Sequence, residues 1–388
     1  MTADAVSTSD SDVIALLEAL IGIDSVNPDL VAGAPGEARI ADFVTGWLTD
    51  RDFSCERLEA NPGRPSVVAF ARGRGGGRSL MLNGHLDTVS LASYDGDGLT
   101  PQRRDGKIFG RGAYDMKSGI AAMMVAASAA NTRQLRGDVV LALVADEEYG
   151  SAGTAEVLRH CTADAAVVVE PSGLDLVLAH LGFAWFDVVI EGVAAHGSRP
   201  DLGIDAITKA GKFLVELERH ATSLAARSST HPLLPAGSIH ASIVDGGEEL
   251  SSYPARCTIS LERRTAVGED SSTVGAELRA MLEAIANNDP GFRYTLRARL
   301  HRNPFAADPD HPIVTTIARA FERTTGRTIT RRGERFWTDC ALLADAGIPA
   351  VLFGVDGAGA HAASEWVTID SLNDTTRVLT DTLIEYCG

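Results

Sequence analysis

The sequence predicts an α/β protein with a mostly parallel sheet, and with a second α+β domain inserted into the first. Three observations support this fold class. Short apolar runs alternate with helical patterns near both ends of the chain, and between them the order changes to βαββαβ. The 388 residues also exceed what one compact core usually holds.

The first part of the chain opens with helical periodicity in DVIALLEALIGI and EARIADFVTGWLTD. Strands are then expected at SVVAF and SLMLNGH. The glycine-rich GRGGGR between them lacks the GK[ST] of a phosphate-binding loop and precedes a strand. We therefore expect a hairpin turn there.

The next segment alternates between helices and buried strands. A helix is expected at KSGIAAMMVAASAANT and another at TAEVLRHC, with apolar strands at GDVVLALVAD and AAVVVEP. This alternation is typical of a parallel sheet with helices on its faces, whose crevice lies at the carboxyl ends of the strands.

The pattern changes after Pro171 to the βαββαβ set, and βαβ alternation resumes at HPIVTTIARAFERTTG. We assign residues 181–299 to an inserted α+β domain. Residues 1–180 and 300–388 form the domain with the mostly parallel sheet, at whose strand ends functional residues are expected.

The composition excludes several classes of protein. A formal charge of −17 repels phosphate backbones and anionic membranes, so we expect neither nucleic-acid nor membrane partners. The amino terminus lacks the pattern of a signal peptide, and the longest apolar stretch is too short to span a bilayer. Five scattered cysteines without CxxC spacing favour a reducing compartment, and we expect a cytoplasmic protein.

Imidazoles and carboxylates recur at or near the predicted strand ends. They lie in LNGHLDTV, GRGAYDMKSG, ADEEYGSAG, VVVEP and AHAASEWV, and the residues are His85, Asp87, Asp115, Glu147, Glu148, Glu170 and His361. Two imidazoles, several carboxylates and a bridging aspartate are what a pair of zinc ions needs to activate one water. A metal-dependent hydrolase is therefore the leading interpretation.

The spacing also indicates individual roles. Strand alternation puts Asp87 on the same side as His85, where it can orient the imidazole. Adjacent acids at a strand end point in different directions, so Glu147 and Glu148 suit one proton carrier and one ligand. Taken singly, each pattern also has an ordinary explanation, namely a structural hydrogen bond, a helix cap or a solvated strand end. For His196, in EGVAAHGSRP, that explanation is an exposed polar loop.

With these residues together, the chain resembles the M20 family of metallopeptidases and amidohydrolases over nearly its whole length. The resemblance implies that His85 and Glu170 hold one zinc, that Glu148 and His361 hold the other, and that Asp115 bridges both. It further implies that Asp87 orients His85, that Glu147 is the general acid/base and that the Asp115–Met116 peptide is cis. His196 matches a histidine that reaches the partner's active site, and the insert corresponds to a lid and dimerisation domain.

The resemblance also suggests substrate-binding positions. Arg264 in SLERRTAVG falls where relatives place an arginine for the substrate carboxylate, and Arg263 beside it leaves the register open. Ser251 stands where asparagine is common. Thr338 lies in FWTDCALL, which resembles a GGTDA segment with Phe336 and Trp337 in place of two glycines.

The expected function is hydrolysis of the amide bond of a small N-acyl amino acid, as in acetylornithine deacetylase or succinyl-diaminopimelate desuccinylase. The expected cofactors are two zinc ions, although cobalt and manganese suit the same ligand types. We also expect a homodimer through the lid. One alternative is a carboxypeptidase or dipeptidase with the same metal pair. Another is a non-catalytic binding protein that keeps the fold.

Overall fold

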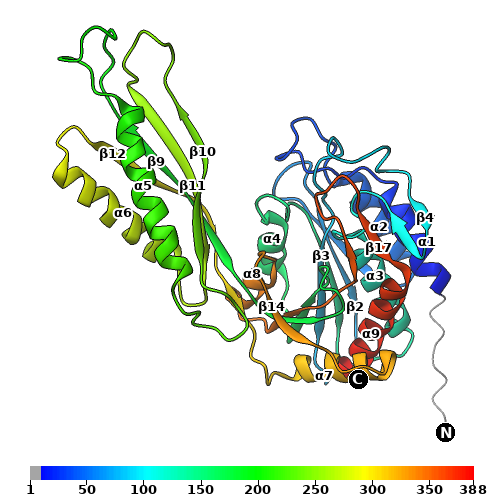
Figure 1. The fold of residues 1–388 in the computed structure, drawn as a ribbon. Helices are drawn as coiled ribbons and strands as arrows, with labels where there is room; N and C mark the ends of the chain where they lie inside the picture. The colour runs from blue at the N-terminus through cyan, green and yellow to red at the C-terminus, as the bar shows by residue number, and fades with distance from the viewer. Residues whose placement is uncertain (1–9) are drawn as a thin grey trace. The chain divides into compact units, whose positions relative to one another are not determined.

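The structure, a computed structural model, describes residues 10–388 (Figure 1). It divides into two compact units. Unit 1 comprises the chain up to Leu178 together with Ala307–Arg332 and Thr338–Gly388, and unit 2 comprises Ala179–Ala306 together with Gly333–Trp337. Unit 2 thus extends beyond the predicted insert, residues 181–299, at both ends. It also includes Gly333–Trp337, which the sequence alone places in the other domain.

A central sheet with the strand order β1-β2-β6-β3-β7-β15-β8-β13 organises the fold, and β14 also pairs with β8. Its four middle strands are parallel and fully buried: β6 (Val139–Val144), β3 (Leu80–His85), β7 (Ala165–Val168) and β15 (Ala350–Leu352). Burial on both faces is typical of parallel strands. The predicted fold class is confirmed.

The remaining strands of this sheet flank the parallel core, and those next to it run antiparallel to their neighbours. They are β1 (Ser54–Leu58), β2 (Ser66–Ala71), β8 (Leu176–His180), β13 (Phe305–Ala306) and β14 (Arg331–Glu334).

The hairpin predicted at GRGGGR is wrong. Strand β6 lies between β2 and β3, antiparallel to the first and parallel to the second. The glycine-rich segment instead passes the start of β6, where the amides of Arg74 and Gly75 donate to the carbonyl oxygens of Leu135 and Arg136. A strand from much later in the chain therefore occupies the place that a hairpin partner would take.

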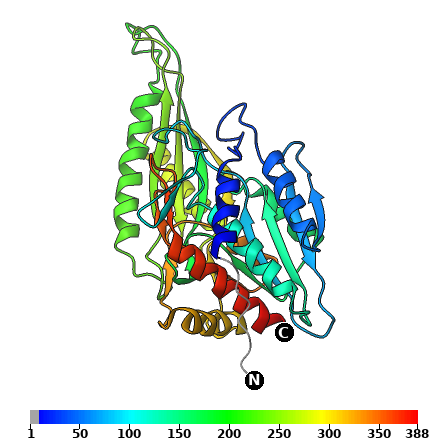
Figure 2. The same ribbon diagram turned by 90° about the vertical axis from the view of Figure 1, so that its right-hand side faces the viewer.

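Helices cover both faces of the central sheet. On one face, α3 (Lys117–Asn131) packs against α1 (Asp10–Ile21) and α9 (Ile369–Cys387), and α9 packs against α7 (Pro312–Thr325) (Figure 2). A Cβ at Gly119 in α3 would lie only 2.1 Å from the carbonyl oxygen of Val169. Glycine therefore allows the first turn of α3 to approach the end of β7.

Two of the remaining helices, α4 (Ala152–His160) and α8 (Cys340–Asp345), lie on the opposite face of the sheet (Figure 1), and α2 (Ala38–Thr49) packs on β1 and β2. A small second sheet has the order β16-β17-β5-β4. Its strands are β16 (Gly357–Ala358), β17 (Trp366–Thr368), β5 (Lys107–Phe109) and β4 (Gln102–Arg104). No helix within residues 10–388 combines the length and the apolar composition that a membrane crossing requires.

Unit 2 contains the predicted βαββαβ order. Its sheet has the order β10-β11-β9-β12 and includes β9 (Gly182–Glu191), β10 (Ser238–Gly246), β11 (Arg256–Thr265) and β12 (Arg293–Arg302). The helices α5 (Ala206–Ala225) and α6 (Ser271–Asn288) pack with these strands around one apolar core. Each helix begins at an aspartate, Asp205 or Asp270, whose side chain accepts an amide of the first turn.

Candidate active site

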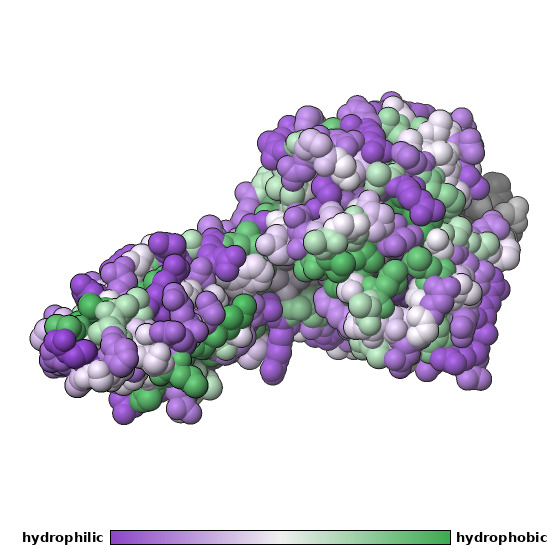
Figure 3. Space-filling model, turned by 90° about the horizontal axis from the view of Figure 1, so that it is seen from above, coloured by the Kyte–Doolittle hydropathy of each residue, from purple (hydrophilic) through white to green (hydrophobic). Residues whose placement is uncertain are grey.

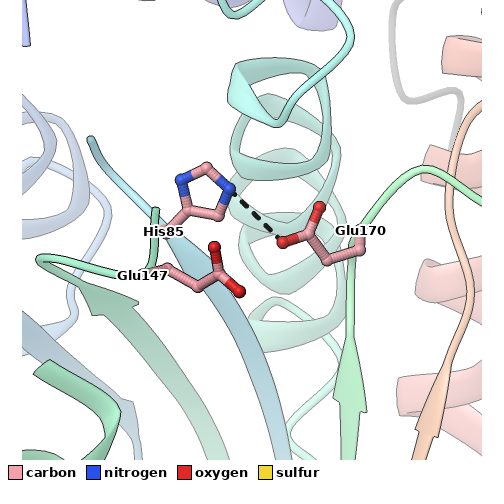
Figure 4. A group of neighbouring side chains, drawn as sticks. All are labelled: His85, Glu147 and Glu170. Atoms are coloured by element: carbon pink, nitrogen blue, oxygen red, sulfur yellow. Dashed lines mark ion pairs between the residues drawn. The ribbon is translucent and has the colours of Figure 1, made fainter. Parts of the chain in front are cut away.

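Three of the predicted site residues lie at the carboxyl ends of neighbouring parallel strands. His85 is the last residue of β3, Glu147 follows β6, and Glu170 follows β7. Because these strands run in the same direction, their ends meet at one edge of the sheet. Figure 4 shows the three side chains facing one another, with an ion pair between His85 and Glu170.

The other predicted ligands join this cluster from loops. His85 Nε2 lies 3.2 Å from Asp115 Oδ1 and 3.3 Å from Glu170 Oε1. His361 Nε2 lies 3.4 Å from Asp115 Oδ2 and 3.0 Å from Glu148 Oε2. The two oxygens of Asp115 therefore face different histidines, as a carboxylate shared by two cations requires. The Asp115–Met116 peptide is cis.

The charges of this cluster match a site for cations. Four acids lie around two imidazoles, so with all four acids ionised the negative charge would exceed the positive charge even if both histidines were protonated. Like charges buried together are unfavourable unless a counter-charge joins them. In addition, Glu148 Oε1 is buried without a hydrogen-bond partner. The donor set of imidazole nitrogens and carboxylate oxygens is one that zinc prefers, so these residues fit divalent metal ions.

His85 is held in the tautomer that a metal ligand needs. Its Nδ1 lies 2.9 Å from the backbone carbonyl oxygen of Asp87. Because a carbonyl only accepts, Nδ1 carries a proton, which leaves Nε2, the nitrogen that faces Asp115 and Glu170, as the one that could bind a metal ion.

The carboxylate of Asp87 contacts a different part of the site. It lies 3.7 Å from His85 Nδ1, whereas it accepts the backbone amides of Glu147 and Glu148 at 3.1 and 3.2 Å. Asn27, fully buried, donates to the same carboxylate at 2.8 Å. Asp87 thus contacts the turn that carries both glutamates, and it contacts the imidazole mainly through its backbone.

Glu147 has the electrostatic setting of a proton carrier. Burial raises its pKa well above the ordinary value, and the negative charges of Glu170 and Asp339 add to this effect. A carboxyl group with a raised pKa can accept and return a proton near neutral pH.

The neighbouring groups also titrate unusually. Burial and the charge of Asp115 raise the pKa of Glu148 and of Glu170 to about 7. Burial alone would raise the pKa of Asp115, but its hydrogen bonds to His361 and His85 lower it instead. Hydrogen bonds to Asp115 and Glu148 raise the pKa of His361 to about 10.

Several residues near the site were not predicted from the sequence. Asp339 is buried beside Glu147 and Glu170, and its carboxylate accepts the hydroxyl of Thr154 at 2.6 Å. Glu365 accepts the backbone amide of Asp115 at 3.0 Å. Only Glu365 had a local signal, since it lies in AHAASEWV, the same short segment as His361. The contacts of Asn27 and Asp339 depend on residues far away in the sequence.

The two candidate arginines of unit 2 have different surroundings. The side chain of Arg263 is 0% exposed and pairs with Glu269 at 2.6 Å. The side chain of Arg264 is 32% exposed and pairs with Glu262, and its guanidinium lies over the ring of Phe183. Of the pair, only Arg264 has a guanidinium that a solute can reach.

Two other candidates, His196 and Ser251, lie together elsewhere in unit 2. Both are exposed, the backbone amide of Gly197 donates to the carbonyl oxygen of Ser251, and His196 Nδ1 lies 2.8 Å from Ser198 Oγ. Thr338 belongs to unit 1 and is buried, with its hydroxyl oxygen 3.4 Å from the amide of Cys340.

His196 and Arg264 belong to opposite ends of the unit 2 sheet. Strand β11 pairs Arg264 with Phe183 and Arg256 with Glu191. At about 3.4 Å per residue, this length of strand spans about 27 Å. His196 follows Glu191 and bridges to Ser252, which precedes Arg256, so it lies beyond the far end of the strand.

Comparison with known proteins identifies the family. The sequence profile described as Peptidase family M20/M25/M40 matches residues 81–385. The chain belongs to this family. The M20 resemblance is therefore confirmed, and the chain is a hydrolase of the metallopeptidase and amidohydrolase type.

The similarity to relatives and to solved structures extends over almost the whole of this M20 chain. An acetylornithine deacetylase of Myxococcus xanthus is 28% identical over 90% of this chain and 92% of its own length. An N-formyl-4-amino-5-aminomethyl-2-methylpyrimidine deformylase of Bacillus subtilis is 26% identical over 97% and 95%. The crystal structure of aminopeptidase PepT from Bacillus cereus superimposes with a TM-score of 0.79 at 20% identity, over 98% and 99%. This last likeness concerns the fold alone.

Proposed function

We propose that this M20 chain hydrolyses the amide bond of a small N-acyl amino acid with the help of two zinc ions. The observation that carries the proposal is the arrangement of Asp115, whose two carboxylate oxygens each face a different histidine. His85 and Glu170 would hold one ion, and Glu148 and His361 the other. The alternative of a non-catalytic binding protein is disfavoured because every proposed ligand and the base are present.

The residues of the site suggest how the reaction proceeds. When bound, two divalent cations make a water molecule acidic enough to act as a nucleophile near neutral pH. Glu147 takes the proton of the attacking water and later gives it to the leaving amine. The carboxylate of Asp87 keeps Glu147 in place by accepting the backbone amide of Glu147. His196 donates a hydrogen bond to the oxyanion that develops on the amide carbonyl.

We predict that the purified, metal-free chain binds two equivalents of zinc, and that removal of the metal abolishes hydrolysis. Calorimetric titration with zinc and elemental analysis measure the stoichiometry, and a chelator followed by zinc, cobalt or manganese tests the return of activity. The cobalt and manganese arms are informative because the same ligand types accept these ions. A chain that binds no divalent metal, or that keeps full turnover without one, contradicts the proposal.

Arg264 is the proposed contact for the substrate carboxylate, and its exposure supports this assignment over Arg263. We predict that Arg264→Ala lowers kcat/KM for an N-acetyl amino acid by about 10- to 100-fold, since a hydrogen bond to a charged group contributes about 1.5–3 kcal/mol. The loss should appear mainly in KM. The matched control is Arg297→Ala, at an exposed position of β12.

The same experiment includes a substrate control. For the corresponding N-acetyl amino acid amide, which lacks the carboxylate, the wild type and Arg264→Ala should have similar kcat/KM values. An equal loss on both substrates would contradict carboxylate recognition.

A dipeptidase or carboxypeptidase is the second candidate, because solved structures with the same fold include an M20 family metallo-carboxypeptidase from Sulfolobus solfataricus and the di-peptidase Dug1p from Saccharomyces cerevisiae. The relatives that are more similar in sequence carry names of deacylating enzymes, which favours the first candidate. A screen of N-acyl amino acids against dipeptides, with the released acid and amine both identified, distinguishes the two.

A homodimer through unit 2 is supported by its surface. Strand β10 is an edge strand, and its Ile243 and Val244 side chains are 61% and 52% exposed. Ile207 and Val215 on α5 are also exposed, and Figure 3 shows hydrophobic side chains among the hydrophilic surface of this unit. Exposed apolar groups next to an unpaired strand edge favour association with a second copy.

The dimer would also account for the separation of His196 from Arg264. Because about 27 Å of strand lies between them in one subunit, a small substrate cannot touch both in the same copy. We therefore assign the oxyanion contact to His196 of a second subunit.

A further inference from the structure

The loops that carry Asp115 and His361 are joined by one buried ion pair. Arg111 and Glu365 are each 1% exposed, and Arg111 Nη1 lies 2.9 Å from Glu365 Oε2. Arg111 follows β5 and Glu365 precedes β17, two strands that pair antiparallel with Trp366 opposite Phe109. The small sheet therefore brings these two residues together.

Glu365 uses all of its acceptor capacity on the loop that ends at Asp115. Its Oε2 accepts from Arg111 and from the amide of Gly112 at 3.0 Å. Its Oε1 accepts from the amides of Tyr114 and Asp115 at 2.9 and 3.0 Å. Only a carboxylate, which has acceptors and no donor, satisfies four donors in this way.

Arg111 makes the corresponding contacts to the loop of His361. Its Nη2 donates to the carbonyl oxygen of Ala362 at 3.1 Å, next to His361 in sequence. Arg111 Nε donates to the carbonyl oxygen of Ser90, and Nη2 also donates to Ser93 Oγ. His361 has a left-handed backbone with φ of 62°, a conformation that persists only where the surroundings determine it.

We propose that Arg111 and Glu365 form a clamp that fixes Asp115 relative to His361, so that the affinity of the ion between them depends on two residues that do not touch it. This inference rests on the proposed function, because it requires metal binding at Asp115 and His361. Both residues are positioning residues, since their hydrogen bonds are with backbone groups, with each other and with the hydroxyl of Ser93, and not with the side chains of Asp115 and His361. Hydrogen-bonding partners behind metal ligands commonly change metal affinity by about 10- to 100-fold.

The test compares Glu365→Gln with the wild type by calorimetric titration of the metal-free chains with zinc. In the glutamine variant, an NH₂ group replaces one carboxylate oxygen, so it faces two of the four N–H groups that donate to Glu365. The variant also leaves the charge of Arg111 uncompensated. We expect one of the two ions to bind about 10- to 100-fold more weakly. The matched control is Glu385→Gln, which removes a carboxylate paired with Arg319 and Arg323 between α7 and α9. This variant should bind both ions normally.

Thermal unfolding with and without zinc separates positioning from general stability. A bound ion stabilises the folded chain in proportion to the logarithm of its concentration over Kd. A merely structural role would lower Tm equally in both conditions, whereas the clamp predicts a smaller rise of Tm on addition of zinc. Arg111→Lys, which keeps the charge but loses the forked contacts, should change zinc affinity in the same direction and decides the question if Glu365→Gln does not fold.

The outcomes are distinct. If the wild type binds no metal, the proposed function fails. If the wild type binds two ions and whichever of these variants fold bind them equally tightly, only the clamp is overturned.

Discussion

Replacing Glu147 with alanine is expected to lower kcat by about 10²- to 10⁴-fold, which is the usual contribution of a positioned general acid or base. The metal content should not change, because the ions are proposed to bind His85, Glu170, Glu148, His361 and Asp115. Stopped assays of amide hydrolysis and elemental analysis of the same preparation measure both quantities.

Two variants make this result specific. Glu147→Gln keeps the size of the side chain and removes the proton acceptor, so it should be as inactive as the alanine variant. The control is Glu156→Gln. Glu156 lies on α4, which packs on β6, and its carboxylate accepts the amide of Ala60. This variant should keep the turnover of the wild type. Substantial activity in Glu147→Gln would exclude Glu147 as the proton carrier.

His196→Ala should lose about 10²- to 10³-fold in kcat, as expected when one donor to an oxyanion is removed. Mixing this inactive variant with inactive Glu147→Ala should restore activity. In a mixed dimer, one of the two sites combines an intact Glu147 with an intact His196 of the partner subunit. Random exchange in a two-fold symmetric dimer should then give about one quarter of the wild-type activity.

The control for subunit exchange is a mixture of two differently tagged chains, in which co-purification of both tags proves that mixed dimers have formed. His196→Ala mixed with wild type should show only the activity of the wild-type chains present. In each mixed dimer, exchange creates one intact site and removes one. Proven exchange without recovery of activity would place both residues of each site in a single subunit.

Local sequence patterns predicted much of the fold and the core of the site. The buried apolar runs of β3, β6, β7 and β15 identify parallel strands, because such strands are covered on both faces. Once these strands are parallel, residues that follow them must gather at one edge of the sheet. For this reason, His85, Glu147 and Glu170 could be grouped without coordinates.

The errors and omissions have a common physical origin. The GRGGGR hairpin failed because turn chemistry describes neighbours in sequence, whereas the neighbour of β2 is decided by where β6 inserts. Asn27, Asp339 and Arg111 escaped notice because a buried polar side chain is recognisable only through its partner. The choice between Arg263 and Arg264 required the burial of each side chain. Strand alternation predicts that the two point to opposite faces of the sheet, but not which face is exposed.

The insertion of unit 2 into the chain of unit 1 has a consequence for how the proposed metal ions would be acquired. His85, Asp115 and Glu170 precede unit 2 in the sequence, whereas His361 follows it. A nascent chain that has completed β3, β6 and β7 would offer one ion a partial set of ligands, but the proposed site of the second ion would have no imidazole until the ribosome has passed unit 2. Full loading would therefore have to wait until both parts of unit 1 are available.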